Sequence, residues 1–340
     1  MISIIISIYN IEKYLRRCLS SIAENNLENT EVLLIDDGST DSTPQICKDF
    51  CNINRVFNYY RKTNGGCTSA RNYGLALSKG NYVFFIDGDD WIEPDLLSKT
   101  KSVIDLYHPG IINFNYYKEY DNFNTKETSS IYSGLKIDDE LKKVKQTLLY
   151  NENMDFFRFS VLPAFWSKII KKELIDKNVC LREEIVFGED LCVTLFALND
   201  AKSIFFMDEF LYHYRQNIDS ITKSYDKRRN SKIKYLIDYL DNRIPMMEND
   251  YSKQYYYYRL FLFQTCILNE SKRIRVSESK DKLLEAMDVL SFNENLSKIS
   301  KVKSSSVNFL FFLIKLKMYY IALVVVRIAF SFKKRKFKNR

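Results

Sequence analysis

Four short apolar runs, each followed by a helical pattern, constrain the fold of this 340-residue chain more than any other feature. The runs are rich in β-branched and aromatic residues, and their length is typical of buried strands in a parallel sheet. Leu15, Cys18, Leu19 and Ile22 then recur at the spacing of an amphipathic helix. Because strands alternate with helices, we predict an α/β fold with a mainly parallel central sheet. The predicted strands are 1–10, 32–35, 55–60 and 82–86, and the predicted helices are 12–24, 41–50, 68–78 and 94–106.

Polar or acidic residues stand where three of these runs end. Tyr9 follows the first run, Asp36 and Asp37 follow the second, and Asp87 and Asp89 follow the last. In parallel sheets, ligands bind outside the carboxyl ends of the strands. The sequence therefore predicts one binding site along one edge of the sheet.

The pattern beyond residue 106 is more varied. It predicts a polar loop, a helix, an irregular aromatic-rich segment, a second helix and two short strands, at 121–140, 139–150, 154–187, 189–198, 203–207 and 210–215. From residue 226 long helical patterns take over. We therefore predict a site-bearing domain at 1–220, a helical region at 221–300 and a separate tail at 301–340.

The cysteine and histidine counts exclude two classes of small scaffold. Seven cysteines, an odd number without repeated spacing, do not form a disulfide framework. Two histidines in the whole chain make a Cys/His zinc site improbable. We expect reduced thiols, as in a cytoplasmic protein.

The charge is concentrated in the tail. Residues 301–340 hold eleven of the 51 Lys and Arg residues and none of the 43 acids, so residues 1–300 carry a net charge of −3. This asymmetry argues against a nucleic-acid partner, which would need a basic face on the folded body. Lys315, Lys317 and Arg327 interrupt the apolar run 307–332 too often for a bilayer span. We predict helices lying on an anionic membrane surface, and the alternatives are a spanning helix or an ordinary packed helix.

Six short motifs occur in one order along residues 1–215. They are Ser7-Ile8-Tyr9-Asn10, Asp36-Asp37-Gly38-Ser39-Thr40-Asp41, Asn64-Gly65-Gly66 with Ala70-Arg71-Asn72-Tyr73-Gly74, Asp87-Gly88-Asp89, Gly188-Glu189-Asp190 and Tyr212-His213-Tyr214-Arg215. In this order and spacing the chain resembles the family 2 glycosyltransferases, inverting enzymes of the GT-A fold that use nucleotide sugars. The resemblance implies a GT-A catalytic domain at 1–220 and does not extend to the helical region.

The resemblance also implies roles for individual residues. The donor side comprises Ser7, Tyr9, Asp36, Asp37, Arg71 and Asp87, with Tyr9 stacking on the base and Asp37 accepting the uracil imide N–H. Asp89, with Asp87, would hold Mg²⁺ or Mn²⁺, since hard cations prefer carboxylate oxygens and neutralise a diphosphate leaving group. Asp190 would be the general base. The acceptor or diphosphate side comprises Trp166, Lys168, Glu189 and Arg215.

Each assignment has a purely structural alternative. Tyr9 and Trp166 could be core aromatics, Arg71 a solvated helix cation, and Glu189 and Asp190 acids that favour a helix N-terminus. Asp90 could cap the turn that follows it. His213 departs from the aromatic residue usual at this place in related sequences, and it is a possible metal ligand.

The sequence thus predicts a transferase. We expect it to move sugar from a nucleotide sugar, most simply a UDP-sugar, to a glycan or lipid-linked acceptor in polysaccharide biosynthesis, on the cytoplasmic face of the plasma membrane. A nucleotidyltransferase is the alternative enzyme, but the chain lacks a Gly-rich, Lys-containing triphosphate loop. A membrane scaffold with a degenerate transferase fold should lack the acids that are present here.

Overall fold

A computed structural model describes residues 1–156, 158–176, 184–216, 224–247, 249–273, 276–299 and 301–338, with the side chains of residues 330–338 left out of the description. The chain divides into two compact units. Unit 1 comprises Met1–Lys145 and Val161–Asn217, and unit 2 comprises Gln146–Ser160 and Ile218–Arg340. No disulfide joins the cysteines that the structure describes, and Cys180 lies outside the described residues.

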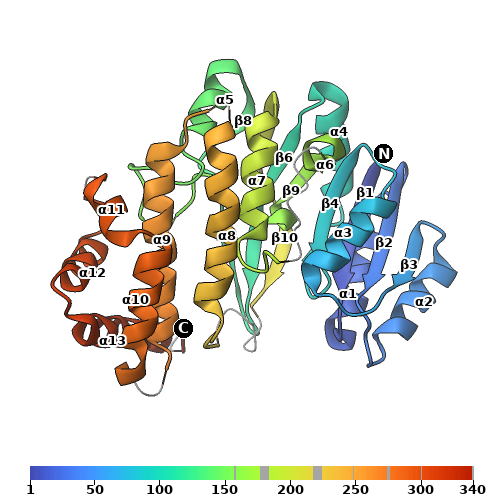
Figure 1. The fold of residues 1–340 in the computed structure, drawn as a ribbon. Helices are drawn as coiled ribbons and strands as arrows, with labels where there is room; N and C mark the ends of the chain where they lie inside the picture. Colours follow the sequence, from blue (N-terminus) through green and yellow to red (C-terminus); the bar gives the residue numbers. More distant parts are fainter. Residues whose placement is uncertain are drawn as a thin grey trace. The chain divides into compact units, whose positions relative to one another are not determined.

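The described strands of unit 1 form one ten-stranded sheet in the order β3-β2-β1-β4-β9-β6-β10-β5, with β7 on β6 and β8 on β10 (Figure 1). The strands β1, β2, β3 and β4 are parallel, and so are β6 and β10. This confirms the predicted α/β fold. The strands span β1 Ile2–Ile8, β2 Thr30–Asp36, β3 Phe57–Arg61, β4 Tyr82–Asp87, β5 Trp91–Ile92, β6 Ile111–Glu119, β7 Asn124–Glu127, β8 Gly134–Ile137, β9 Lys168–Lys171 and β10 Ser203–Arg215.

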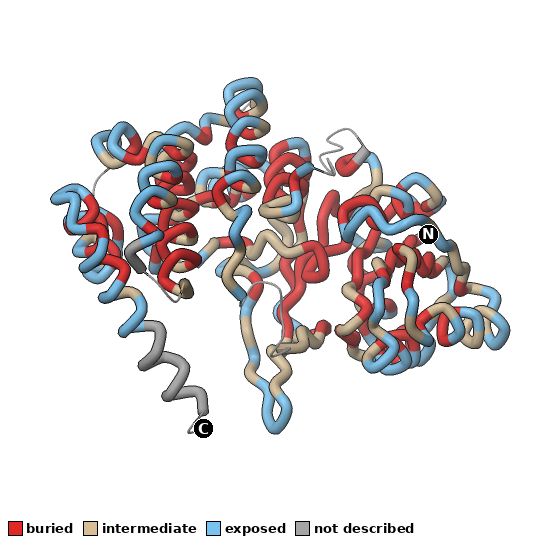
Figure 2. Tube along the Cα trace, turned by 60° about the horizontal axis from the view of Figure 1, so that its bottom comes forward, coloured by how far each residue is buried: buried red, intermediate tan, exposed pale blue. Residues whose placement is uncertain are grey.

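The side chains of β1 alternate between the two faces of the sheet. Ile4 and Ile6 pack with Leu15 and Cys18 of α1 in the main core, while Ser7 points to the other face, where its Oγ lies 3.3 Å from Cys67 Sγ of α3. β1, β2 and β4 are almost wholly buried, as their continuous apolar runs indicate. Buried segments of the chain are red in Figure 2. The helices of unit 1 are α1 Glu12–Ala23, α2 Thr43–Ile53, α3 Cys67–Leu77, α4 Leu96–Tyr107, α5 Asp138–Lys145, α6 Lys172–Asp176 and α7 Glu189–Asp200.

Three parts of the predicted layout need correction. The segment predicted as irregular contains β9, which lies antiparallel between β4 and β6. The predicted loop 121–140 contains β7 and β8, which pair with longer strands. The two short strands predicted near the end of unit 1 form a single strand, β10, whose register shifts between Phe206 and Tyr212. β7, β8 and β9 have four residues each and are partly polar, so their pairing comes from their neighbours rather than from their own periodicity.

Unit 2 is helical in its described part. Its helices α8 and α9 carry apolar stripes that pack against each other and against α10, as the long periodic patterns predict. The tail forms two helices, and no described helix is long and apolar enough to cross a membrane. The helices are α8 Arg229–Arg243, α9 Ser252–Glu270, α10 Lys280–Val289, α11 Phe292–Ser297, α12 Ser305–Lys315 and α13 Tyr319–Lys338.

Candidate active site

The predicted site residues of the first four strands meet at one edge of the sheet. In the parallel register Ser7 pairs with Asp87, and Ile8 pairs with Asp36, so the ends of β1, β2 and β4 lie level with one another. Tyr9 follows β1 and leaves 49% of its surface exposed. An exposed ring at a strand end is available for stacking, which a core aromatic is not.

The two acids after β2 are buried, and both have partners within the protein. The oxygens of Asp36 accept hydrogen bonds from the Ser39 amide at 2.8 Å and the Tyr59 hydroxyl at 2.6 Å. Asp36 therefore organises the turn after β2, and its buried carboxylate offers no surface to a ligand.

Asp37 holds the loop that leads into α3. Its oxygens accept from Lys62 Nζ at 2.8 Å, from the Gly65 amide at 3.0 Å and from the Gly66 amide at 2.7 Å. A carboxylate has about four lone-pair positions, so three donors leave capacity for one more. The Asn64-Gly65-Gly66 motif thus supplies amides to Asp37, a role that the sequence does not reveal.

Arg71 joins the two ends of the site. Its guanidinium is 7% exposed and lies 2.9 Å from Asp87 Oδ1, 3.3 Å from Asp190 Oδ1 and 3.4 Å from Glu189 Oε1. The ring of Phe165 lies beneath it, 5.0 Å from the guanidinium carbon. Arg71 is therefore not a solvated helix cation. Its guanidinium holds Asp87 at the end of β4 close to Glu189 and Asp190 at the start of α7.

Asp190 has the ionisation expected of a base at neutral pH. Loss of hydration in the site raises its pKa to about 7; Arg71 opposes this rise, and the negative charges of Glu189 and Asp87 reinforce it. The backbone N–H of Phe165 also bonds to its carboxylate. A group that titrates near the working pH is well suited to general base catalysis.

The turn after β4 exposes two acids and buries the third. Asp90 is buried and accepts from the Tyr212 hydroxyl and from the Arg215 amide, both at 2.7 Å. Burial and the nearby Asp89 and Asp87 raise its pKa well above the usual range. Asp90 thus has a structural role, but its carboxylate holds the end of β10 rather than capping the turn that follows it. Asp87 is 31% exposed, and Asp89 is also partly exposed.

The acids of this turn fit a divalent cation. Asp87, Glu189 and Asp190 surround Arg71 and carry more negative charge than it neutralises, while Asp89 stands one residue beyond Gly88. The described residues contain no group of three or more potential ligands. Mg²⁺ commonly binds one or two carboxylates together with substrate phosphates, so Asp89 and Asp87 form a sufficient protein contribution.

Trp166 and Lys168 lie in the core. Trp166 stacks between Tyr212 and Tyr214, at ring-centroid distances of 4.8 and 5.0 Å. The Lys168 ammonium is buried, donates to the carbonyls of Leu162 and Ala164, and has a pKa lowered by burial to about 7. Both residues hold in place the segment that carries Phe165, so in this structure they affect the site through that segment and do not line it.

Both ring nitrogens of His213 are occupied. Nδ1 lies 2.7 Å from Glu119 Oε1, and Nε2 lies 2.9 Å from Glu93 Oε1. The ring also stacks between Trp91 and Tyr117. This arrangement leaves no nitrogen for a metal ion. Sequence reasoning missed Glu93, Glu119 and Phe165, because no local pattern connects them with the residues they contact.

Comparison with known proteins agrees with this geometry. The family model described as "Glycosyl transferase family 2" matches residues 3–168, the part of the chain that holds the strand-end acids and Arg71. Residues 3–168 belong to glycosyltransferase family 2. The predicted resemblance is therefore confirmed.

Two curated relatives of this family 2 domain share further sequence. Glycosyltransferase GlyA of Streptococcus pneumoniae is 32% identical over 253 residues, which are 73% of this chain and 35% of GlyA. Putative glycosyltransferase EpsH of Bacillus subtilis is 27% identical over 311 residues, which are 87% of this chain and 86% of EpsH. The chain thus spans about a third of the length of GlyA and most of EpsH.

A solved structure shares the fold of nearly the whole chain. The crystal structure of S. aureus TarS 1–349 in complex with UDP-GlcNAc has a TM-score of 0.70 at 19% identity, covering 97% of this chain and 91% of that one. The likeness shows that the two chains share a fold over nearly their whole length.

Proposed function

We propose that this protein is an inverting glycosyltransferase that moves a sugar from a nucleotide sugar to a hydroxyl group of a glycan or lipid-linked acceptor in bacterial polysaccharide synthesis. The observation that carries this proposal is the Arg71 cluster, in which Asp87 of the metal-binding turn and Asp190 of α7 lie on one guanidinium. In this proposal the diphosphate binds near Asp87, and Asp190 beside it acts as the base. Curated relatives named for polymer synthesis include GgaB, a minor teichoic acid biosynthesis protein.

Asp190 is the base in this proposal. The acceptor oxygen attacks the anomeric carbon from the face opposite the diphosphate, the bond from that carbon to the diphosphate breaks, and the electron pair leaves with the phosphate oxygen. The acceptor proton passes to the Asp190 carboxylate. Glu189 and Arg71 keep this carboxylate in place through the ion pairs described above.

Asp89 and Asp87 would hold Mg²⁺ or Mn²⁺. The cation supplies Lewis-acid neutralisation of the charge that develops on the diphosphate. Arg215 is a further candidate for the diphosphate or acceptor side, because its Nε donates to the Asp89 carbonyl at 2.8 Å. Trp166 and Lys168 would serve the acceptor side by positioning the 161–168 segment.

We propose a uridine nucleotide as the donor. Tyr9 offers an exposed ring, and Ser7 lies near the end of β1 beside Asp87. The uracil imide N–H would bond to the remaining acceptor position of Asp37, although only 2% of this residue is exposed. The relative TarS is described as a poly(ribitol-phosphate) β-N-acetylglucosaminyltransferase and was crystallised with UDP-GlcNAc. The shared fold is compatible with a UDP-sugar as the donor.

We also propose that the basic tail binds an anionic membrane surface, which would place the catalytic domain (1–220) and the helical region (221–300) at the cytoplasmic face. Both tail helices bury one side and expose another, and the tail has no acid. The exposed large apolar residues are Phe309, Phe312, Leu316, Met318, Tyr320, Ile321, Val324, Val325 and Ile328. The basic run at 333–340 belongs to the same proposal, although its side chains lie outside the described residues.

A nucleotide-release assay tests the proposed activity. The full chain is incubated with a panel of UDP- and GDP-sugars, in Mn²⁺ and in EDTA, and the released nucleotide is measured. We expect UDP release that requires the cation. Release from GDP-sugars alone would overturn the base assignment, and full release in EDTA would overturn the metal assignment.

A further inference from the structure

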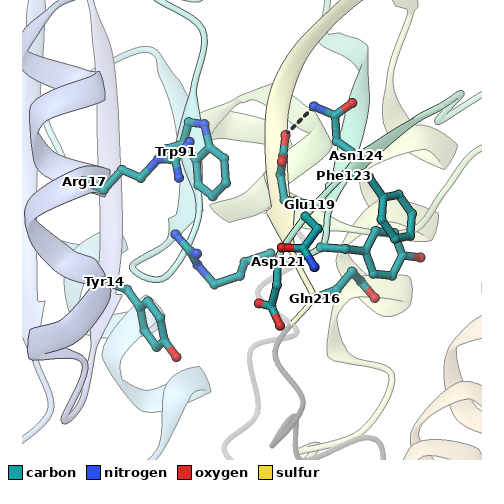
Figure 3. Close-up of a pocket in the computed structure, with 11 residues that line it drawn as sticks. Tyr14, Arg17, Trp91, Glu119, Asp121, Phe123, Asn124 and Gln216 are labelled. Carbon is teal, nitrogen blue, oxygen red and sulfur yellow. Dashed lines mark hydrogen bonds between the residues drawn. The ribbon is translucent and has the colours of Figure 1, made fainter. Parts of the chain in front are cut away.

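A cavity of about 450 Å³ opens in unit 1 next to the Asp87-Gly88-Asp89 turn (Figure 3). Of the residues that line it, Arg215 alone has been given a role above, as a candidate for the diphosphate or acceptor side. Its walls come from α1, β5, the β6–β7 turn and the end of β10. The residues that matter here are Tyr14, Arg17, Trp91, Glu119, Asp121 and Arg215. The size is within the range of small-ligand pockets.

Aromatic rings hold two guanidinium groups in this cavity. The guanidinium carbon of Arg17 lies 3.4 Å from the centroid of the Trp91 ring. That of Arg215 lies 4.8 Å from the same ring and 4.7 Å from the ring of Tyr14. A ring face orients a guanidinium but leaves its N–H groups and its charge available at the edge. Two cations are therefore displayed together on one aromatic support.

No carboxylate neutralises these cations within the described residues. Neither Arg17 nor Arg215 forms an ion pair there, whereas the neighbouring Arg16 pairs with Asp49 at 3.1 Å. The pKa of Arg17 lies below its usual range, first because burial removes part of its hydration and second because the charge of Arg215 is close. Arg17 remains charged, since arginine keeps its proton under all ordinary conditions.

Of the acids in the cavity wall, Glu119 is close enough for its charge to oppose the lowering of the Arg17 pKa, but it forms no ion pair with Arg17 in the part of the chain that the structure describes. Glu119 is engaged with His213 Nδ1 at 2.7 Å and with Asn124 Nδ2 at 3.3 Å. Asp121 stands on the β6–β7 turn, and in Figure 3 its carboxylate points away from Arg17 and Trp91. The cavity therefore offers two guanidinium groups on one aromatic support, and their planar N–H donors suit bidentate bonds to a phosphate group.

Arg17 lies away from the proposed diphosphate position at Arg71, although Arg215 is next to the Asp89 backbone. Asp87 faces Arg71 of α3, while the preceding residue, Ile86, faces the core that includes α1 residues. Because successive side chains of a strand point to opposite faces, Arg17 of α1 lies on the other face of the sheet from Arg71. A second phosphate could thus bind while a donor occupies the first position.

We propose that this cavity binds a phosphate group of the acceptor through Arg17 and Arg215, so that the acceptor is a phosphate-containing lipid or polymer. The inference rests on the proposed glycosyl transfer. A phosphate held here lies away from the reacting hydroxyl, and binding energy from such a remote group can orient the acceptor at the reaction centre.

The test uses Trp91 as the reporter and sn-glycerol 3-phosphate as the probe. Tryptophan emission of the full chain is titrated with the probe, and with glycerol at matched ionic strength, each with and without saturating UDP and Mn²⁺. The variants are Arg17→Gln and, as a matched control on the same helix, Arg16→Gln, whose side chain is 61% exposed. Trp91→Phe identifies the signal, since Trp166 is the second tryptophan. UDP affinity of every variant is measured by calorimetry.

We expect the phosphate probe, and not glycerol, to change the Trp91 emission whether or not UDP is bound. Arg17→Gln should weaken the affinity for the phosphate probe by about tenfold or more. Arg16→Gln should leave that affinity within about twofold of the wild-type value. UDP affinity should be unchanged in both. The proposal is overturned by a silent wild-type protein, by equal affinities of Arg17→Gln and wild type, or by displacement of the probe by UDP, which would assign the cavity to the donor diphosphate. If the wild-type protein responds to the probe but does not bind UDP, the result would instead count against the proposed function alone.

Discussion

Asp190 and Arg71 have different roles in the same cluster of charged side chains. Arg71 is always charged and buried, so it fixes three carboxylates without exchanging protons. Asp190 has a pKa near 7 and can accept a proton and release it. A carboxylate left without the guanidinium would be protonated more readily and less well placed. The pair therefore sets both the geometry and the ionisation of the proposed base.

Replacing Asp190 by Asn keeps the shape of the side chain and removes its basicity. We expect the transfer rate to fall by about 10²–10⁴, the usual contribution of general base catalysis. UDP affinity should change little, because Asp190 contacts no donor group in the proposal. Transfer assays and calorimetry measure the two quantities. If the variant transfers at the wild-type rate, Asp190 is not the base, and Glu189 and Asp190 only stabilise the N-terminus of α7.

The pH profile gives an independent reading of the same residue. Because the deprotonated carboxylate is the active form, kcat/KM should rise with pH, reach half its maximum near the Asp190 pKa of about 7, and level off above it. The residual activity of Asp190→Asn should lack this step. A wild-type profile that is flat between pH 6 and 8 would contradict the assignment.

Asp89 carries the metal prediction. Asp89→Ala should abolish nearly all cation-dependent transfer while the chain stays folded, since Asp89 is partly exposed and its loss leaves no cavity in the core. Circular dichroism checks the fold, and activity is measured over a Mn²⁺ titration. Asp90→Ala is an informative contrast, because it removes the acceptor of two buried hydrogen bonds and should lower stability. Full activity of Asp89→Ala without added cation would exclude the metal role.

At the scale of elements, α3 can lie close against the sheet because Gly74 has no side chain at the point of contact. A Cβ atom on Gly74 would lie 2.4 Å from Ile5 Cγ2 and 3.1 Å from Ile35 Cγ1. The helix carries Arg71 one turn earlier, so a displaced α3 would also move the guanidinium. Helix position and site geometry are thus coupled through this contact.

Gly74→Ala should therefore destabilise the protein by about 1–3 kcal/mol, the usual cost of overpacking, despite the better helix propensity of alanine. Transfer should fall as well, because Arg71 shifts. Thermal unfolding and transfer assays measure both effects. Ala76→Ser, an exposed position on the same helix, is the control and should change stability by less than about 0.5 kcal/mol. If Gly74→Ala is as stable and active as this control, the close contact is unimportant.

At the scale of the whole molecule, the tail distinguishes this chain from a bare catalytic domain. The alternatives of a packed helix and a membrane-facing helix both describe part of the structure: Leu310, Phe311 and Ile314 are buried, while Phe312 and Ile321 are exposed on the same two helices. Truncation would expose the buried side, so surface variants are the better test.

The full chain should float with anionic liposomes and only partly detach in high salt, because headgroup attraction is screened and apolar insertion is not. The double variant Phe312→Asp and Ile321→Asp should lose flotation. The control Leu106→Asp removes an apolar residue of unit 1 that is more exposed than either tail residue, and it should float like the wild type. Equal flotation of the tail variant and wild type would show that the tail has another partner.

The sequence by itself determined the α/β class, the site edge and the order of the motifs. Those features depend on local periodicity and on residues that end strands, such as Asp36 and Asp87, so they can be read without contacts. Only the tertiary structure decided that Arg71 bridges Asp87 and Asp190, more than a hundred residues apart, and that Asp36 is buried.

The same reason explains the other differences. β9 is a strand because β4 and β6 offer it two partners, and His213 lies between Glu93 and Glu119 because three separate segments pack there. Such contacts arise from the packing of distant segments, and no periodicity within any one segment records them.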